Sequence, residues 1–198
     1  KRMAGSTDNV MSFLNRLYDV YYPAAKRELD EITKLAQKDG IDEMQSWDFS
    51  YYTEKLKKIK FDFDQEDLRP YFKVENVIDG IFQVAELMYG LKFIEINDVP
   101  IYHKEVRVYE VYEENDDFLA LFYIDLHPRE TKNGGAWMTE FRSQGLYEGI
   151  VERPLVAIVC NLTPSTEKKP SLLTFNEVET IFHEFGHALH GMLSNVTY

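Results

Sequence analysis

The chain has 198 residues and a formal net charge of −12, with 44% hydrophobic and 14% aromatic residues. This apolar content is enough to form a buried core in one or two domains. The negative charge argues against binding to nucleic acid or to an anionic membrane surface, because both need a basic patch. No apolar run approaches the ~20 residues of a membrane span, and the single Cys160 excludes an intrachain disulfide.

The first hundred residues are predicted to be helical. Apolar side chains recur with helical spacing from residue 9 to residue 37, and Tyr22-Pro23 predicts a break or kink within that stretch. Residues 48–59 and 76–91 are predicted to form two further helices. We therefore expect residues 1–100 to be a helical segment.

After Pro100 the apolar pattern becomes typical of strands. Residues 106–112 and 118–126 are rich in Val, Tyr, Phe and Leu and flank an acidic turn, which predicts an antiparallel hairpin. Residues 155–162 read as a more continuous apolar strand. Residues 101–165 are therefore expected to form a small sheet region, and the predicted fold class is mainly α with a small antiparallel β-sheet.

The segment 166–198 contains the motif His183-Glu-Phe-Gly-His187, inside a predicted helix. Thr174 and Glu177 form a T-x-x-E capping box, which predicts that this helix begins near Phe175. Two histidines four residues apart lie on one helix face, close enough to share one metal ion. Because apolar residues surround the pair, we expect the helix to be buried on most sides.

The residue between the two histidines, Glu184, lies beside their face. From there its carboxylate can take a proton from a metal-activated water without occupying a coordination position. The alternative is two core histidines, each hydrogen-bonded to a backbone carbonyl or a carboxylate. The spacing, the added glutamate and the capped helix favour a Zn²⁺ site with His183 and His187 as ligands and Glu184 as the catalytic base.

Two further residues on this helix are expected to support the metal site without binding the ion. His190 shares a face with His187 but lies a further turn along the helix, and Glu179 lies one turn before His183. A catalytic zinc also needs a third protein ligand and an open position for water. No Asp, Glu or Cys follows His187, so a downstream glutamate ligand is expected to lie beyond residue 198.

The sequence from His183 to Gly191 resembles the metal helix of the thimet oligopeptidase family of zinc peptidases, family M3. The resemblance extends over nearly the whole chain and is closest to the bacterial peptidyl-dipeptidase branch of that family. The other matching segments are Trp47-Asp48, Tyr51-Tyr52, Arg69-Pro-Tyr-Phe72, Val99-Pro-Ile-Tyr-His103, Val106-Arg-Val108, Gly134-Gly-Ala-Trp-Met138 and Val159-Cys-Asn161.

This resemblance implies a zincin-like helical peptidase in which two halves enclose a deep channel, with a small sheet at the channel wall. It implies that the chain is a piece of a longer protein, with the active-site helix at the C-terminal end of this piece. Gly135 and Ala136 are expected to bind the backbone of a short peptide substrate. The other expected partner is the remainder of the same parent chain.

The function predicted is a zinc metallopeptidase that releases C-terminal dipeptides, while the isolated chain is expected to be inactive. An endopeptidase of the same family and a non-catalytic zinc module that ties helices together are the alternatives. The residues that follow Lys1-Arg2 lack the apolar core of a signal peptide, which favours a cytoplasmic location and leaves a periplasmic one open.

Overall fold

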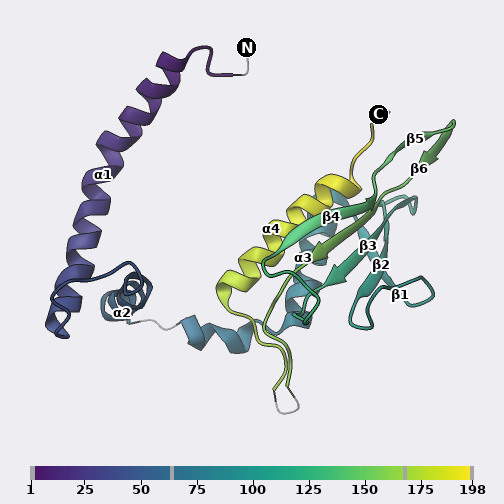
Figure 1. Ribbon diagram of the computed structural model, residues 1–198. Helices are drawn as coiled ribbons and strands as arrows, with labels where there is room; N and C mark the ends of the chain where they lie inside the picture. The colour runs from purple at the N-terminus through teal and green to yellow at the C-terminus, as the bar shows by residue number, and fades with distance from the viewer. Residues whose placement is uncertain (1–2, 63–64, 167–168, 197–198) are drawn as a thin grey trace. The chain divides into compact units, whose positions relative to one another are not determined.

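The computed structural model describes residues 3–62, 65–166 and 169–196. The chain divides into two compact units, Lys1–Asp64 and Gln65–Tyr198, which are called here the helical unit and the sheet unit (Figure 1). In the described ranges, no helix is both long enough and apolar enough to cross a membrane.

The helical unit consists of α1 (Thr7–Lys38) and α2 (Phe49–Phe61). The helix α1 continues through Pro23, so no break occurs there, and the predicted alternative, a kink, stays a prediction. Pro23 removes one backbone hydrogen bond and crowds the carbonyl one turn earlier. Since this part of α1 is exposed, water can satisfy the carbonyl left without its partner.

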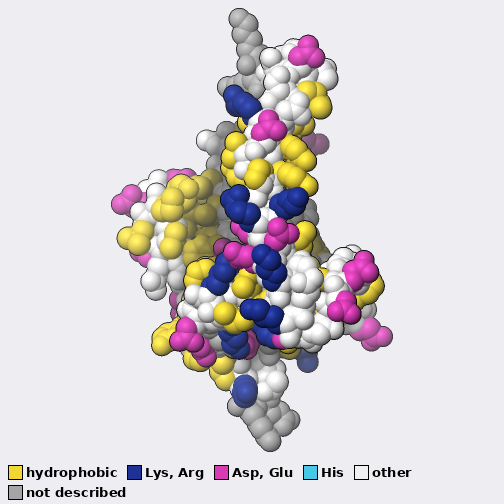
Figure 2. Space-filling view, turned by 90° about the vertical axis from the view of Figure 1, so that its left-hand side faces the viewer, with side chains coloured by type: hydrophobic (Ala, Val, Ile, Leu, Met, Phe, Trp, Pro, Cys, Tyr) yellow, Lys and Arg dark blue, Asp and Glu magenta, His cyan; other side chains and the backbone are white. Residues whose placement is uncertain are grey.

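Apolar burial in the helical unit is confined to the place where α1 meets α2. Its small core consists of Ile32, Ala36 and Tyr52. Figure 2 shows apolar side chains at the surface of α1 among charged ones. The exposed apolar residues of α1 are Val10, Met11, Phe13, Leu14, Leu17, Tyr18, Val20, Tyr21, Tyr22 and Leu29. The apolar period of α1 therefore predicts the helix correctly, but only Ile32 and Ala36 of α1 are buried within this unit.

The described residues of the sheet unit form three helical elements and seven strands. The helical elements are the 3₁₀ helix η1 (Gln65–Tyr71), α3 (Val74–Tyr89) and α4 (Phe175–Met192). The strands are β1 (Lys92–Ile96), β2 (Arg107–Tyr112), β3 (Phe118–Asp125), β4 (Trp137–Arg142), β5 (Gly145–Tyr147), β6 (Ile150–Glu152) and β7 (Leu155–Val159). The prediction missed β1, β4, β5 and β6, and β1 lies within the segment expected to be helical.

The main sheet has the strand order β1-β2-β3-β7-β4, and β5 and β6 form a separate hairpin. The predicted β2–β3 hairpin is confirmed. The prediction of a purely antiparallel sheet is wrong, because β3 and β7 pair in parallel. Both strands are nearly continuous apolar runs that are buried on both faces, as is typical of central parallel strands.

The helices α3 and α4 cover one face of the sheet. The main core lies there and includes Ile81 of α3, Phe122 of β3, Ile158 of β7 and Phe185 of α4. The side chains of alternate residues, among them Tyr123 and Ala157, form a smaller cluster on the opposite face. The strand β4 is an edge strand that pairs only with β7 among the described strands.

Candidate active site

The metal-motif helix α4 is held at both ends by side chains. At its start, Thr174 Oγ1 accepts from Glu177 N at 3.1 Å and Glu177 Oε2 accepts from Thr174 N at 2.8 Å, which confirms the predicted capping box. Glu177 Oε1 also accepts from the backbone N of Thr163, beyond β7, at 2.8 Å. Burial raises the pKa of Glu177, but these hydrogen bonds outweigh it and the pKa is lowered.

At the other end of α4, the guanidinium of Arg153 donates to Met192 O at 2.9 Å and to Ser194 O at 3.3 Å. A third hydrogen bond from Arg153 reaches Leu119 O at the start of β3, at 2.7 Å. A cation at a helix C-terminus satisfies carbonyls that the helix leaves unpaired and interacts favourably with the helix dipole. Glu177 and Arg153 therefore fix the position of α4 on the sheet from both sides.

The two histidines of the motif lie close together, with His183 Nε2 3.2 Å from His187 Nε2 and the ring planes at 81°. This is a hydrogen-bond distance, and it is also the separation of two nitrogen ligands of one zinc ion. Zn–N bonds of about 2.0–2.1 Å at tetrahedral angles place two nitrogens about 3.3 Å apart. The pair of imidazoles therefore fits a shared metal ion.

Both histidine side chains are exposed, so the expectation that they lie in a helix buried on most sides is wrong. The apolar residues of α4 gather on the sheet side, while His183 and His187 occupy a flank of the helix. In the part of the chain that is described, no third His, Cys, Asp or Glu joins them in a cluster able to hold a metal. The exposed flank leaves room for further ligands and for water.

The carboxylate of Glu184 is in a different environment from the two histidines. Glu184 is 7% exposed, on the side of α4 that faces the sheet. Burial, and then the negative charge of Glu184, raises the pKa of the Cys160 thiol at the end of β7 to about 12. Cys160 is therefore a neutral core side chain at working pH.

Glu179 and His190 are both exposed on α4. Neither makes a hydrogen bond or ion pair with His183 or His187 among the residues described. Their supporting role around a metal stays a prediction.

The histidine pair lies on the flank of α4 that is nearer to β4. Phe185 packs toward Phe82 of α3, with ring centroids 6.2 Å apart, which defines the other flank. Gly191 lies directly against Glu140 of β4, because a Cβ added at Gly191 would be only 2.6 Å from the Glu140 carboxylate. His187 is one turn before Gly191 on the same face, and Figure 1 shows α4 running beside β4.

Gly135 and Ala136 immediately precede the edge strand β4. Gly135 adopts a φ of +94°, which glycine tolerates without strain. The side chain of Ala136 packs against the main core. Among the described residues, nothing accepts a hydrogen bond from the backbone N–H of Gly135 or Ala136. These two residues and the outer edge of β4 thus offer backbone groups to an added strand.

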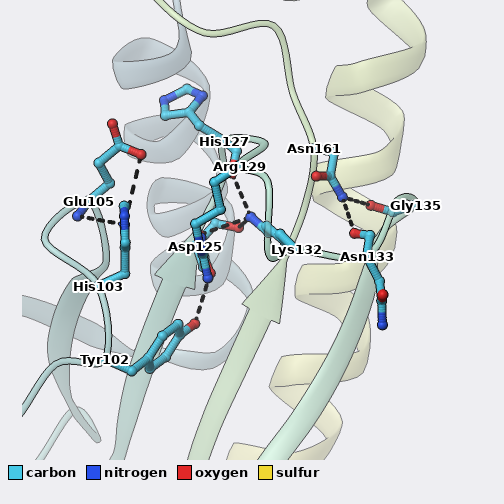
Figure 3. Close-up of polar contacts among 10 residues, drawn as sticks. All are labelled: Tyr102, His103, Glu105, Asp125, His127, Arg129, Lys132, Asn133, Gly135 and Asn161. Atoms are coloured by element: carbon cyan, nitrogen blue, oxygen red, sulfur yellow. Dashed lines mark hydrogen bonds and ion pairs between the residues drawn. The ribbon is translucent and has the colours of Figure 1, made fainter.

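A buried charged network that the sequence did not predict lies on the sheet face opposite the helices (Figure 3). Asp125, at the end of β3, is 1% exposed. It accepts two hydrogen bonds from Arg129 at 2.9 Å, one from Lys132 at 2.9 Å and one from Tyr102 Oη at 3.0 Å. Burial raises the pKa of Asp125, but the hydrogen bonds from Arg129 and Lys132 outweigh it and the pKa is lowered.

An H-E-x-x-H motif on a helix, with its two histidines close enough to share one metal ion, is typical of zinc metalloproteases. Comparison of the sequence with known families agrees with this class. The profile of Peptidase family M3 matches residues 1–198. The chain belongs to peptidase family M3.

The chain is similar to curated members of that family from bacteria and yeast. It is 39% identical to oligopeptidase A of Escherichia coli over 197 residues and 37% identical to dipeptidyl carboxypeptidase of the same species over 199 residues. It is 34% identical to saccharolysin of Saccharomyces cerevisiae over 207 residues. These matches cover 98%, 100% and 97% of this chain and 29% of each relative. The chain therefore spans less than a third of the length of these relatives.

Proposed function

We propose that this chain is part of a longer zinc metallopeptidase and contributes two metal ligands, the catalytic base and one wall of the peptide site. The observation that carries the proposal is the Nε2–Nε2 distance of 3.2 Å between His183 and His187, with the buried Glu184 carboxylate between them in sequence. The similarity to peptidases over the length of the chain supports it.

His183 and His187 would hold the metal through their Nε2 atoms, and the third protein ligand would come from outside this chain. When bound, a zinc ion lowers the pKa of a water toward ~7 and polarises the scissile carbonyl. Glu184 accepts a proton from the attacking water as the new C–O bond forms, and it passes that proton to the leaving nitrogen as the C–N bond breaks. The edge of β4, together with Gly135 and Ala136, aligns the peptide by backbone hydrogen bonds.

The substitution Glu184→Gln in the full-length protein tests the proposal. We expect zinc content to be unchanged and kcat to fall by several orders of magnitude, because glutamine cannot accept the proton. His183→Ala should lose zinc and activity together. Glu75→Gln, an exposed carboxylate on α3, serves as the control and should leave kcat unchanged. Near-normal turnover by Glu184→Gln with full zinc content would rule out Glu184 as the catalytic base.

For specificity, we propose release of C-terminal dipeptides, with internal cleavage of short peptides as the alternative. The chain has almost the same identity to an oligopeptidase and to a dipeptidyl carboxypeptidase, so the proposal rests on the motif matches outside the metal helix. The test compares one peptide as its free acid and as its C-terminal amide, with products identified by mass. Stepwise dipeptides from the free acid alone would support the proposal, and internal cuts in both would favour the endopeptidase.

A non-catalytic zinc module is the second alternative. It predicts four protein ligands on the metal and no water, whereas a catalytic site keeps one open position. Turnover by the zinc-loaded full-length protein distinguishes the two, because only a site with an open position can bind and activate a water.

A further inference from the structure

The side chain of Asn161, just after β7, bridges two carbonyls of the loop that leads into β4. Its Nδ2 donates to Asn133 O and to Gly135 O, each at 2.8 Å (Figure 3). Both partners are acceptors, so only the amide nitrogen can face them, and both of its N–H groups are used. The two carbonyls lie on either side of Gly134.

The loop itself has little that could hold it in one conformation. Apart from their chain neighbours, no atom lies within 4 Å of where a Cβ would be at Gly134 or Gly135. Paired glycines also lose more conformational freedom on ordering than other residues do. The order of this loop must therefore come from contacts made by side chains outside the glycine pair.

Two such contacts are present, one at the beginning of the loop and one at its middle. Lys132, whose side chain is 3% exposed, anchors the beginning by donating to Asp125 O at 3.1 Å, Asp125 Oδ1 at 2.9 Å and His127 O at 2.8 Å. Asn161 holds the middle and leaves the N–H groups of Gly135 and Ala136 free. Asn161 thus holds the backbone next to the N–H groups that are available to a peptide.

Asn161 also links this loop to the neighbourhood of the catalytic carboxylate. It directly follows Cys160, whose thiol is close enough to Glu184 for that charge to raise its pKa. Cys160 therefore lies within electrostatic range of Glu184, and the next residue, Asn161, contacts the loop before the edge strand. A shift of the loop relative to β7 would change the position of a paired peptide relative to Glu184.

We propose that Asn161 is a positioning residue that holds the Asn133–Gly135 backbone in the conformation that pairs with a substrate peptide. This inference rests on the proposed peptidase function. Asn161→Ala leaves two carbonyls unbonded and the loop free to move. Asn161→Asp places a carboxylate against the same two carbonyl oxygens and should be the more harmful of the two. Asn161→Gln keeps both donors on a longer side chain and should restore part of the activity.

The test measures kcat/KM of the full-length wild type and of each variant with a parent peptide and with modified peptides. One substrate backbone amide at a time is replaced by an ester, which removes an N–H donor and weakens the carbonyl acceptor. We expect at least one ester position to reduce kcat/KM of the wild type about tenfold, the effect of one or two lost hydrogen bonds. In Asn161→Ala that loss should shrink to less than about twofold, because the pairing is already lost. KM for the parent peptide should rise about tenfold, with zinc content and the pH profile unchanged.

Asn115→Ala is the matched control. Asn115 also uses its amide to order a loop, by donating to Asp117 Oδ2 at 2.8 Å in the β2–β3 turn, away from β4. It should keep the wild-type response to every ester. An active enzyme whose ester sensitivity is the same in wild type and Asn161→Ala overturns this inference alone. A zinc-loaded wild type that cleaves none of the peptides overturns the proposed function and this inference with it.

Discussion

The helical unit and the sheet unit have similar helix signals in sequence but bury their apolar side chains to very different degrees. In the sheet unit, α3 buries Val77, Ile78 and Ile81 against the sheet. In the helical unit, α1 is twice as long as α3, with 32 residues against 16, yet it buries only Ile32 and Ala36. An apolar helical period therefore predicts a helix with an apolar face. Whether that face is buried depends on which other elements pack against it.

Removing a large core side chain gives the largest expected difference between the units. Phe122 is 0% exposed and its ring contacts those of Phe82, Phe93 and Phe185. Phe122→Ala should lower the free energy of unfolding of the sheet unit by about 3–5 kcal/mol. Leu14→Ala, on the exposed part of α1, should change it by less than about 0.5 kcal/mol.

The effects of Phe122→Ala and Leu14→Ala on stability can be measured by urea unfolding of the 198-residue chain in a Trp47→Phe background. Only Trp137, in β4 of the sheet unit, then reports by fluorescence, since the chain has two tryptophans. Equal effects of the two substitutions would mean that the sheet unit does not depend on its own core.

The buried carboxylate of Asp125 gives the next largest effect. Asp125→Asn should destabilise the sheet unit by about 3 kcal/mol, because Arg129 and Lys132 lose their charged partner in a buried position. The lowered pKa of Asp125 means that its ion pairs stabilise the fold above the ordinary pKa near 3.8, and that this stability is lost as pH falls below about 4.

Unfolding free energies measured from pH 7 down to pH 2 check the direction of this pH dependence. The wild type should lose stability below about pH 4 more steeply than Asp125→Asn. In the helical unit, Lys55 pairs with the exposed Asp39, and Lys55→Ala should have little effect at any pH. A wild-type acid profile that matches that of Asp125→Asn would contradict the assignment.

Two glycines of α4 should respond in opposite directions. A Cβ at Gly191 would lie 2.6 Å from Glu140 Oε1, the mobile end of a flexible side chain, and 3.3 Å from Val156 Cγ2, so Gly191→Ala should cost about 1 kcal/mol, at the low end of overpacking. Apart from the backbone of α4 itself and the chain neighbours, no atom lies within 4 Å of the corresponding position at Gly186, where alanine should stabilise the helix by up to about 1 kcal/mol. Thermal unfolding of both variants tests the close approach of α4 to β4, and a neutral Gly191→Ala would argue against it.

The N-caps of α4 and α1 give the smallest expected difference. Thr174 Oγ1 accepts from Glu177 N at 3.1 Å and Ser6 Oγ accepts from Asn9 N at 3.2 Å. Thr174→Ala should cost the sheet unit about 1 kcal/mol, because α4 packs on β7 and β4 and its end is part of the cooperative fold. Ser6→Ala should only fray the exposed start of α1. Amide hydrogen exchange separates global loss of protection in the first variant from local loss in the second.

The sequence by itself determined the features that depend on residues close together in the chain. These are the capping box of Thr174 and Glu177, the β2–β3 hairpin, and the spacing that brings His183 and His187 within 3.2 Å of each other. Each follows from helix or hairpin geometry over a few residues, so the pattern of side chains is sufficient to specify it.

Only the tertiary structure decided how these pieces combine. The parallel pairing of β3 with β7, the free edge of β4 and the exposure of the two histidines all depend on contacts between distant segments. Strand order and burial are fixed by which apolar faces meet in three dimensions, and periodicity along the chain carries no record of that choice. The bridge from Asn161 to the glycine loop spans 26 residues for the same reason, because one amide meets two carbonyls only after β7 has entered the sheet beside β4.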